Sequence, residues 1–320
     1  MAGNAATTPI ERLEAFARGR FGLFTPTEAA RFGVSRALLG YHSRSSGRWS
    51  RVLPSVYQLA GQPPDRRRPL FAALLWGGDD AVLSHRSAAA VLRLDGVRFG
   101  RPELRTYRKA LRGGPIVHRP PVGPDVATRT GLLRHTGVLR TVIDLATVLD
   151  DDTLELVIES AIRRQPTCEA ILRLVASQGC YGAPRLRRVL ARRVPGSPPT
   201  DSELETRYLQ VIRAGDVPPP VRQHRVLDDT GRCIGRLDLC WPEVGLWVEL
   251  DGRATHDRPQ ALLYDRHRQN EVATRLQWLP LRFTWDDVVM HSAHTASFTE
   301  TAYRRRAGWQ ANTRAPAGDP

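Results

Sequence analysis

Two acidic residues near one predicted β-hairpin are the strongest candidates for chemistry in this chain. Asp238 and Glu249 lie in two runs of alternating apolar and polar residues, and the loop Pro242–Gly245 separates those runs. Such alternation is typical of strands with one buried face. A four-residue loop places Trp241 opposite Leu246 and, in the same register, Asp238 opposite Glu249.

The two faces of this predicted hairpin differ in character, because period-2 alternation sorts the acidic residues onto one side. The apolar face comprises Leu237, Leu239, Trp241, Leu246, Val248 and Leu250. The other face comprises Asp238, Cys240, Trp247, Glu249 and Asp251. The same register predicts an ion pair between Asp251 and Arg236.

Opposed carboxylates need a compensating charge. Side chains opposite each other on neighbouring strands have Cβ atoms about 4.5–5.5 Å apart, where like charges destabilise the sheet. A hard divalent cation offsets that repulsion, and Mg²⁺, or Mn²⁺ in its place, binds one or two carboxylates together with substrate phosphate. We therefore predict that Asp238 and Glu249 bind the metal, with Glu205 completing the acidic cluster. The alternative is that Asp238 and Glu249 are solvent-facing charges on a half-exposed sheet.

A helix, three strands, a second helix and a fourth strand are predicted around these carboxylates. Ser202 can cap the first helix, which carries Leu204, Tyr208 and Ile212 at helical spacing. The predicted strands cover residues 221–227, 233–241, 246–251 and 278–283, the second helix covers 259–275, and a short helix begins at Asp286. This order predicts an α/β core of the form αβββαβ.

The stretch 236–288 resembles the PD-(D/E)XK nuclease superfamily, and within it the domains related to very-short-patch-repair endonucleases. The matching pieces are RLDL, WVELDG, DGRATH, the YDRHRQN helix and the LRFTWDDV ending. The resemblance covers residues 199–310 and implies a restriction-endonuclease-like fold. It also implies that Asp238 and Glu249 are the metal ligands.

The same resemblance implies roles for further residues. Glu205 would be the acidic residue of the first helix, and His256 would activate the attacking water. Asp265 and Arg268 would line the site, with Arg268 contacting DNA. One departure concerns Asp251, which stands where the superfamily motif has Lys. Asp251 stays among the catalytic candidates, and the identity of the base is open between His256 and Arg236.

The first sixty residues predict a winged helix. Thr25 and Glu28 have capping-box spacing at the start of one helix, Gly33 ends that helix, and Ser35 caps the next. Helix, glycine-containing turn and helix are typical of a helix-turn-helix. A predicted hairpin that turns at residues 53–55 adds a wing.

The stretch TPTEAARFGVSRALLGYHSRSSGRWSRVLPSVYQLAG resembles the N-terminal winged helix of abortive-infection type IV antitoxins. This resemblance implies DNA binding and regulation of its own promoter. A recognition helix would enter the major groove while a basic wing contacts the backbone. The candidate DNA-binding residues here are Ser35, Arg36, Tyr41, His42, Arg44, Arg48 and Arg51. The alternative is a winged helix that serves protein–protein contact or structure alone.

Charge and composition restrict the class of protein. The chain has 320 residues, with 47 Lys+Arg against 33 Asp+Glu, a net charge of +14 and a pI of 10.7. Such a positive field favours nucleic acid as a partner. The sequence lacks an apolar run near the ~18 residues of a membrane span, and its N-terminus lacks the apolar region of a secretory signal. We therefore expect a cytoplasmic protein without a membrane partner.

Proline- and glycine-rich stretches at residues 61–69 and 194–202 divide the chain. We predict an α/β multidomain protein with a winged helix-turn-helix at residues 1–62 and an α+β middle domain at 63–195. The restriction-endonuclease-like α/β core would follow at 196–310, and a disordered tail at 311–320.

Two functions from different classes fit this organisation. The first is a Mg²⁺-dependent endodeoxyribonuclease that hydrolyses phosphodiester bonds of double-stranded DNA, in DNA repair or phage defence. The second is a non-catalytic, antitoxin-like transcriptional regulator with a degenerate nuclease fold and a toxin or other protein as partner. The departure at Asp251 leaves room for the second. A structured-RNA nuclease is a third hypothesis, and the sequence offers it no obvious platform for stacking single-stranded bases.

Overall fold

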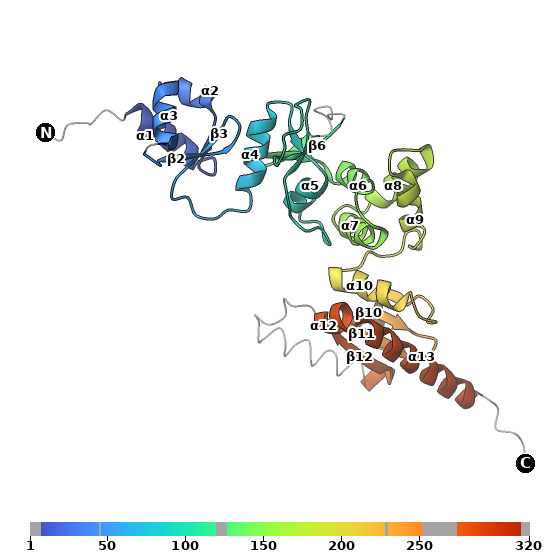
Figure 1. Cartoon of the computed structure of the whole chain (residues 1–320). Coiled ribbons are helices and arrows are strands. Elements are labelled where there is room, and N and C mark those ends of the chain that lie inside the picture. Colours follow the sequence, from blue (N-terminus) through green and yellow to red (C-terminus); the bar gives the residue numbers. More distant parts are fainter. Residues whose placement is uncertain (1–7, 45, 120–126, 228–229, 252–273, 315–320) are drawn as a thin grey trace, which may run out of the picture. The chain divides into compact units, whose positions relative to one another are not determined.

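The computed structural model of the chain describes residues 8–44, 46–119, 127–227, 230–251 and 274–314, and the chain divides into two compact units (Figure 1). The first unit is Met1–Val148 and the second is Leu149–Pro320. This boundary falls inside the middle domain expected from the sequence. The finer division at residues 62 and 195 stays a prediction.

The first unit begins with the expected helix-turn-helix and hairpin. Capping boxes at Thr8–Glu11 and Thr25–Glu28 start its first two helices, and the Ser35 hydroxyl accepts a hydrogen bond from the Leu38 amide at 3.2 Å. The hairpin strands pair antiparallel, and a short strand joins them in a three-stranded sheet of order β1-β3-β2. The elements are α1 (Pro9–Arg18), β1 (Leu23–Phe24), α2 (Pro26–Arg31), α3 (Arg36–Arg44), β2 (Trp49–Leu53) and β3 (Val56–Leu59).

A buried carboxylate supports the core of this winged helix. Glu14 is 5% exposed and accepts hydrogen bonds from the indole Nε1 of Trp49 at 3.0 Å and from Nη2 of Arg48 at 2.9 Å. The Arg48 guanidinium holds the pKa of Glu14 below its usual value. Trp49 itself packs in a cluster with Leu13 and Phe24.

The rest of the first unit is a five-stranded mixed sheet with helices, of order β6-β5-β4-β8-β7. This stretch combines helices with short strands, which include the hairpin β7–β8. The elements are α4 (Arg68–Gly77), β4 (Val82–Leu83), α5 (His85–Leu92), β5 (Glu103–Arg105), β6 (Ile116–His118), β7 (Ala127–Thr130), β8 (Leu133–Thr136) and α6 (Val138–Leu145).

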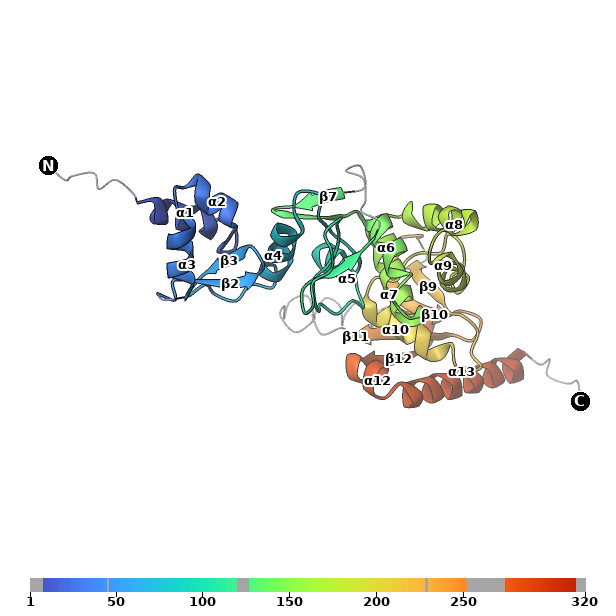
Figure 2. The ribbon, with the colours of Figure 1, turned by 45° about the horizontal axis from the view of Figure 1, so that its top comes forward.

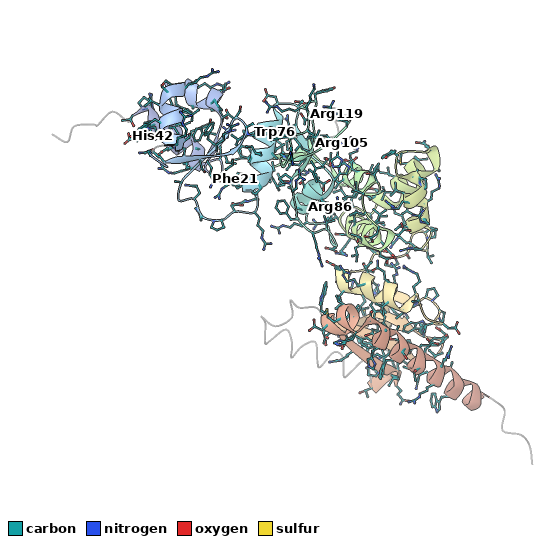
Figure 3. The ribbon with its side chains drawn as sticks, in the orientation of Figure 1. Phe21, His42, Trp76, Arg86, Arg105 and Arg119 are labelled. Carbon is teal, nitrogen blue, oxygen red and sulfur yellow. The ribbon has the colours of Figure 1, made fainter. Side chains whose placement is uncertain are left out.

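An apolar cluster joins the winged helix to α4. Leu23 and Val56 of the winged helix belong to one buried cluster with Phe71 and Trp76 of α4, and Phe21 packs against it (Figure 3). The Phe21 and Phe71 rings meet edge to face at 5.6 Å. The winged helix is therefore packed onto α4, the first helix of the part of the unit that contains the five-stranded sheet.

The second unit begins with three helices tied to its sheet by buried ion pairs. Arg193 bonds Glu159 at 2.6 Å and Glu169 at 3.0 Å, and Arg222 of the first strand bonds Glu159 at 2.9 Å. Because each buried charge has an opposite partner, the desolvation of these groups is offset. The helices are α7 (Asp151–Arg164), α8 (Cys168–Gln178) and α9 (Ala183–Leu190).

The remaining elements form a mixed sheet of order β12-β11-β10-β9, in which β11 and β12 are parallel and the other pairs antiparallel. The predictions for the first helix and for all four strands of this core are confirmed, while the second predicted helix, 259–275, lies almost entirely outside the described residues. Helices α10, α12 and α13 pack on one face of the sheet (Figure 2). The elements are α10 (Glu203–Ile212), β9 (Val221–Leu227), β10 (Cys233–Trp241), β11 (Leu246–Asp251), β12 (Leu279–Thr284), α12 (Trp285–Met290) and α13 (Ser292–Arg314).

Helix α13 extends into the stretch expected to be a disordered tail, since it continues to Arg314. Within the described part of the chain, none of the helices combines the length and apolar character needed to cross a membrane.

The Glu14 contacts generate a stability prediction. We expect Glu14→Ala to destabilise the winged helix by about 2 kcal/mol, because it leaves the buried Trp49 indole N–H without an acceptor. Amide hydrogen exchange in α1 and β2 measures this local stability. Arg12→Ala, an exposed control on the same helix, should change exchange by less than about 0.5 kcal/mol. Equal protection in the Glu14 and Arg12 variants would contradict the structural role of Glu14.

Candidate nucleic-acid interface and carboxylate site

Helix α3 presents most of its surface to solvent. Leu39 is its one buried residue, and it anchors the helix in the core of the winged helix. Arg36 and Arg44 are exposed, and the ring of Tyr41 is 57% exposed. This helix carries no acidic residue in its first turn. Its outer face therefore combines cations with an aromatic ring, which suits contact with DNA.

The other predicted DNA-binding residues differ in how available they are. His42 is half-buried, with Nδ1 3.0 Å from the Ser46 hydroxyl and its ring 4.8 Å from that of Trp49. Arg48 is paired with Glu14, so part of its charge is compensated. Arg51 of the wing is exposed. Ser35 acts as the cap of α3.

A cleft of about 1360 Å³ opens beside α2 and α3 within the first unit. Its walls come from the winged helix and from the part of the unit that contains the five-stranded sheet, including helix α4 and strands β7 and β8. Among the described residues, its lining contains seven arginines and three acidic residues. The arginines are Arg20, Arg31, Arg36, Arg44, Arg108, Arg129 and Arg134, and the acidic residues are Glu28, Asp79 and Asp80.

Some of these arginines have structural partners and others do not. Arg20 pairs with Glu28, Arg108 lies over the Trp76 ring, and Arg134 bonds backbone carbonyls. In the part of the chain that the structure describes, Arg31, Arg36, Arg44 and Arg129 make no ion pair. Cations without a protein partner remain free to neutralise phosphate.

Sequence reasoning missed Arg129, which lies on β7. The signal was present, because Gly131 has φ +58° at the first position of the two-residue loop between β7 and β8. Thr128 and Thr130 before this glycine and Thr136 after it also have high strand propensity, as expected for a hairpin.

The carboxylate hairpin of the second unit has the predicted register. Trp241 pairs with Leu246, and the next two pairs follow the same register as far as Leu239 with Val248. Asp238 and Glu249 occupy the positions one step further along the two strands. Both side chains are half-buried.

The predicted division of faces is wrong at Leu237. Leu239, Trp241, Leu246 and Val248 belong to the cluster under α10 as expected, but Leu237 belongs to a second cluster with Val226, Cys240 and Trp247. The neighbouring strand is irregular here, since Gln223, between the partners of Leu237 and Leu239, has φ +53°. The second face is also more apolar than expected, because Cys240 and Trp247 are buried.

Glu205 is a buried carboxyl of this region with a perturbed pKa. It is 4% exposed, and its oxygens accept hydrogen bonds from the Asp201 amide at 2.9 Å and the Gln223 side chain at 3.0 Å. Burial raises the pKa of Glu205 to about 7. The bond from Asp201 opposes this rise, and the negative charge of Asp238 adds to it. The structure thus brings Glu205 within electrostatic reach of Asp238.

Other acidic residues have cationic neighbours. Arg282 of β12 lies 3.5 Å from a Glu249 oxygen, which agrees with the alternative that Glu249 is an ordinary paired charge on the sheet. The expected pair of Arg236 with Asp251 is wrong, because Arg236 pairs with Asp201 instead. Asp251 is exposed at the end of β11.

Two predicted site residues, His256 and Arg268, lie outside the described residues, as does Asp265. Among the described residues, the three carboxylates Glu205, Asp238 and Glu249 are not a group whose ligand atoms all lie within 4.8 Å of one another. The metal site therefore stays a prediction.

Comparison with known proteins concerns the first unit. Residues 11–60 match the family described as a transcriptional regulator, the AbiEi antitoxin. The matched stretch contains the helix-turn-helix and the wing, and it is a minor part of the chain. None of the curated proteins matches.

The Glu205 pKa generates a prediction on pH. The pKa of Glu205 is about 7 in the folded chain and has its ordinary value of 4.5 in the unfolded chain. The protonated carboxyl therefore stabilises the fold fully below pH 4.5, and this stabilisation is lost as the pH rises through about 7. We expect a loss on the order of 3 kcal/mol over this window. Glu205→Gln should flatten the pH dependence of the free energy of unfolding.

Amide hydrogen exchange in α10 and β10 at pH 5 and pH 8 tests this, with both proteins compared at each pH. Glu203→Gln, on the same helical turn, is the matched control and should keep the wild-type dependence. A Glu205→Gln protein that loses as much protection as wild type between the two values would contradict the prediction.

Proposed function

We propose that this protein is a DNA-binding transcriptional regulator of the antitoxin type. One observation carries the proposal. The winged helix matches a family of transcriptional regulators, and cations without an acidic partner among the described residues lie on its helix α3 and on the cleft beside it. Helix α3 would enter the major groove, where Arg36, Tyr41 and Arg44 meet base edges and phosphates. A protein toxin as partner is part of this proposal and follows from the family description alone.

The cleft extends the proposed interface beyond the winged helix. Arg129 of β7 lines the same cleft as Arg36 and Arg44 of α3. An arginine beside the recognition helix would contact the sugar–phosphate backbone and fix the register of the protein on DNA. Such a contact adds affinity without sequence preference.

A DNA-binding assay with two duplexes separates these roles. One duplex is the region upstream of the protein's own coding sequence, and the other is a scrambled duplex of equal length. We expect Arg36→Ala and Arg44→Ala to weaken binding to the first duplex roughly tenfold or more. Arg129→Ala should weaken binding to both duplexes alike and reduce the salt slope by about 1.

Arg12→Ala, exposed and outside the cleft, serves as the control. If the Arg36 and Arg44 variants bind both duplexes as tightly as wild type, the proposal fails. If they lose affinity and Arg129→Ala does not, the interface is confined to the winged helix.

Phosphodiester hydrolysis by the second unit is a second candidate function. The specific observation in its favour is the buried Glu205 with its raised pKa next to Asp238, since carboxyls perturbed in this way concentrate at functional sites. The donors fit a hard cation by chemical type, and Asp238 and Glu249 would hold Mg²⁺ or Mn²⁺. The bound ion would polarise a phosphoryl oxygen and acidify a water. Glu205 would hold a proton near neutral pH.

A plasmid-nicking assay with Mg²⁺ or Mn²⁺ tests this candidate. We expect nicking by wild type that chelation abolishes, and at least a hundredfold loss in Asp238→Asn and Glu249→Gln. Asp216→Asn removes an exposed acid of the same unit and should stay active. Intact plasmid after incubation with wild type and either metal would eliminate the nuclease function and leave the regulator untouched.

A further inference from the structure

Three side chains that the proposed function does not use converge on one face of the five-stranded sheet. His85 opens α5, Glu103 lies on β5 and His118 ends β6. Their ligand atoms all lie within 4.8 Å of one another. The register pairs Glu103 with Ile116, so His118 is the diagonal neighbour of Glu103 on the same face.

This cluster is buried, and each inner residue is held by a second polar group. His85 and Glu103 are each 2% exposed. The Ser84 hydroxyl lies 2.9 Å from Nδ1 of His85, and Arg86 donates to Oε1 of Glu103 at 3.2 Å. These contacts leave Nε2 of His85 and Oε2 of Glu103 for a ligand, and Oε2 now meets Nε2 of His118 at 2.7 Å.

The geometry of the two histidines is unusual for a structural core. His85 has φ +49°, a left-handed conformation that is uncommon for a buried residue other than glycine. Its ring stacks on that of His118 with centroids 3.4 Å apart and planes 17° from parallel. Backbone strain of this kind concentrates at ligand and active sites.

We propose that His85, Glu103 and His118 bind a divalent transition-metal ion of the zinc class. Two imidazoles with one carboxylate form a donor set for such ions, with a further position open to water or a ligand. Imidazole donors also favour Zn²⁺ or Co²⁺ over Mg²⁺. Ser84 and Arg86 would orient two of the ligands from behind, as outer partners do in metal sites (Figure 3 labels Arg86).

Metal binding requires one movement. An imidazole coordinates in its ring plane, so His118 must turn out of the stack and exchange its hydrogen bond to Glu103 for a bond to the metal. His118 has room to turn, because its side chain is 19% exposed and β6 is an edge strand of the sheet. His85 and Glu103 stay in place.

Titration of the full chain with Co²⁺ tests the site. Excess Mg²⁺ is present throughout to compete at carboxylate-only sites such as the one proposed in the second unit. We expect one Co²⁺ per chain with visible d–d absorption, and at least tenfold weaker binding in His118→Ala and Glu103→Gln. His291→Ala removes an exposed histidine of the second unit and should bind as wild type does.

Stability provides a second readout. Zn²⁺ should increase amide protection in β5 and α5 of wild type, and His118→Ala should keep its fold but lose this increase. Wild-type and His118→Ala proteins that bind Co²⁺ equally, or a wild type without the absorption band, would overturn the proposal. Either result leaves DNA binding through α3 unaffected, so the two proposals fail separately.

Discussion

The apolar contact between the winged helix and α4 is the constraint on which the first unit depends. Leu23 and Val56 are buried against Phe71 and Trp76 in one cluster. Burial of a large aliphatic or aromatic side chain contributes about 1.5–3 kcal/mol each. This contact holds α3 and β7 on the same cleft, so that cations far apart in the sequence act on one surface. A tethered winged helix without this packing would present α3 alone.

Paired and unpaired charges have different roles in this protein. In the second unit, the buried acid Glu159 is matched by arginines, through its bonds from Arg193 and Arg222. These pairs position helices against the sheet. Among the described residues of the first unit, Arg36, Arg44 and Arg129 lie on the cleft without acidic partners. Unmatched cations on a surface are therefore a more specific argument for the proposed interface than the net charge of the whole chain.

Local sequence signals predicted much of the fold. The hairpin around Pro242–Gly245 was predicted with its register, because loop residues and alternation agree there. The helix starts at Thr25 and Ser202 followed from capping chemistry, which acts within one turn. Such signals depend on residues three or four apart and need no knowledge of the tertiary structure.

The remaining features depend on contacts that periodicity does not contain. Leu237 changes faces beside an irregular neighbouring strand, where Gln223 takes a left-handed conformation. The meeting of His85 with His118 depends on the order of strands in the middle sheet. Arg48 forms an ion pair with Glu14, which partly neutralises its charge and connects the wing to the first helix. Each required the assembled structure.

The cations of the cleft are all guanidinium groups, and this limits how the cell can modulate them. Guanidinium stays protonated at every physiological pH, whereas an ammonium on a lysine can be neutralised by acylation. Lys109 is the single lysine of the chain. Acidification or acetyl transfer would therefore leave the proposed attraction of Arg31 and Arg36 for phosphate almost unchanged, and dissolved ions would be the main solution variable that weakens it.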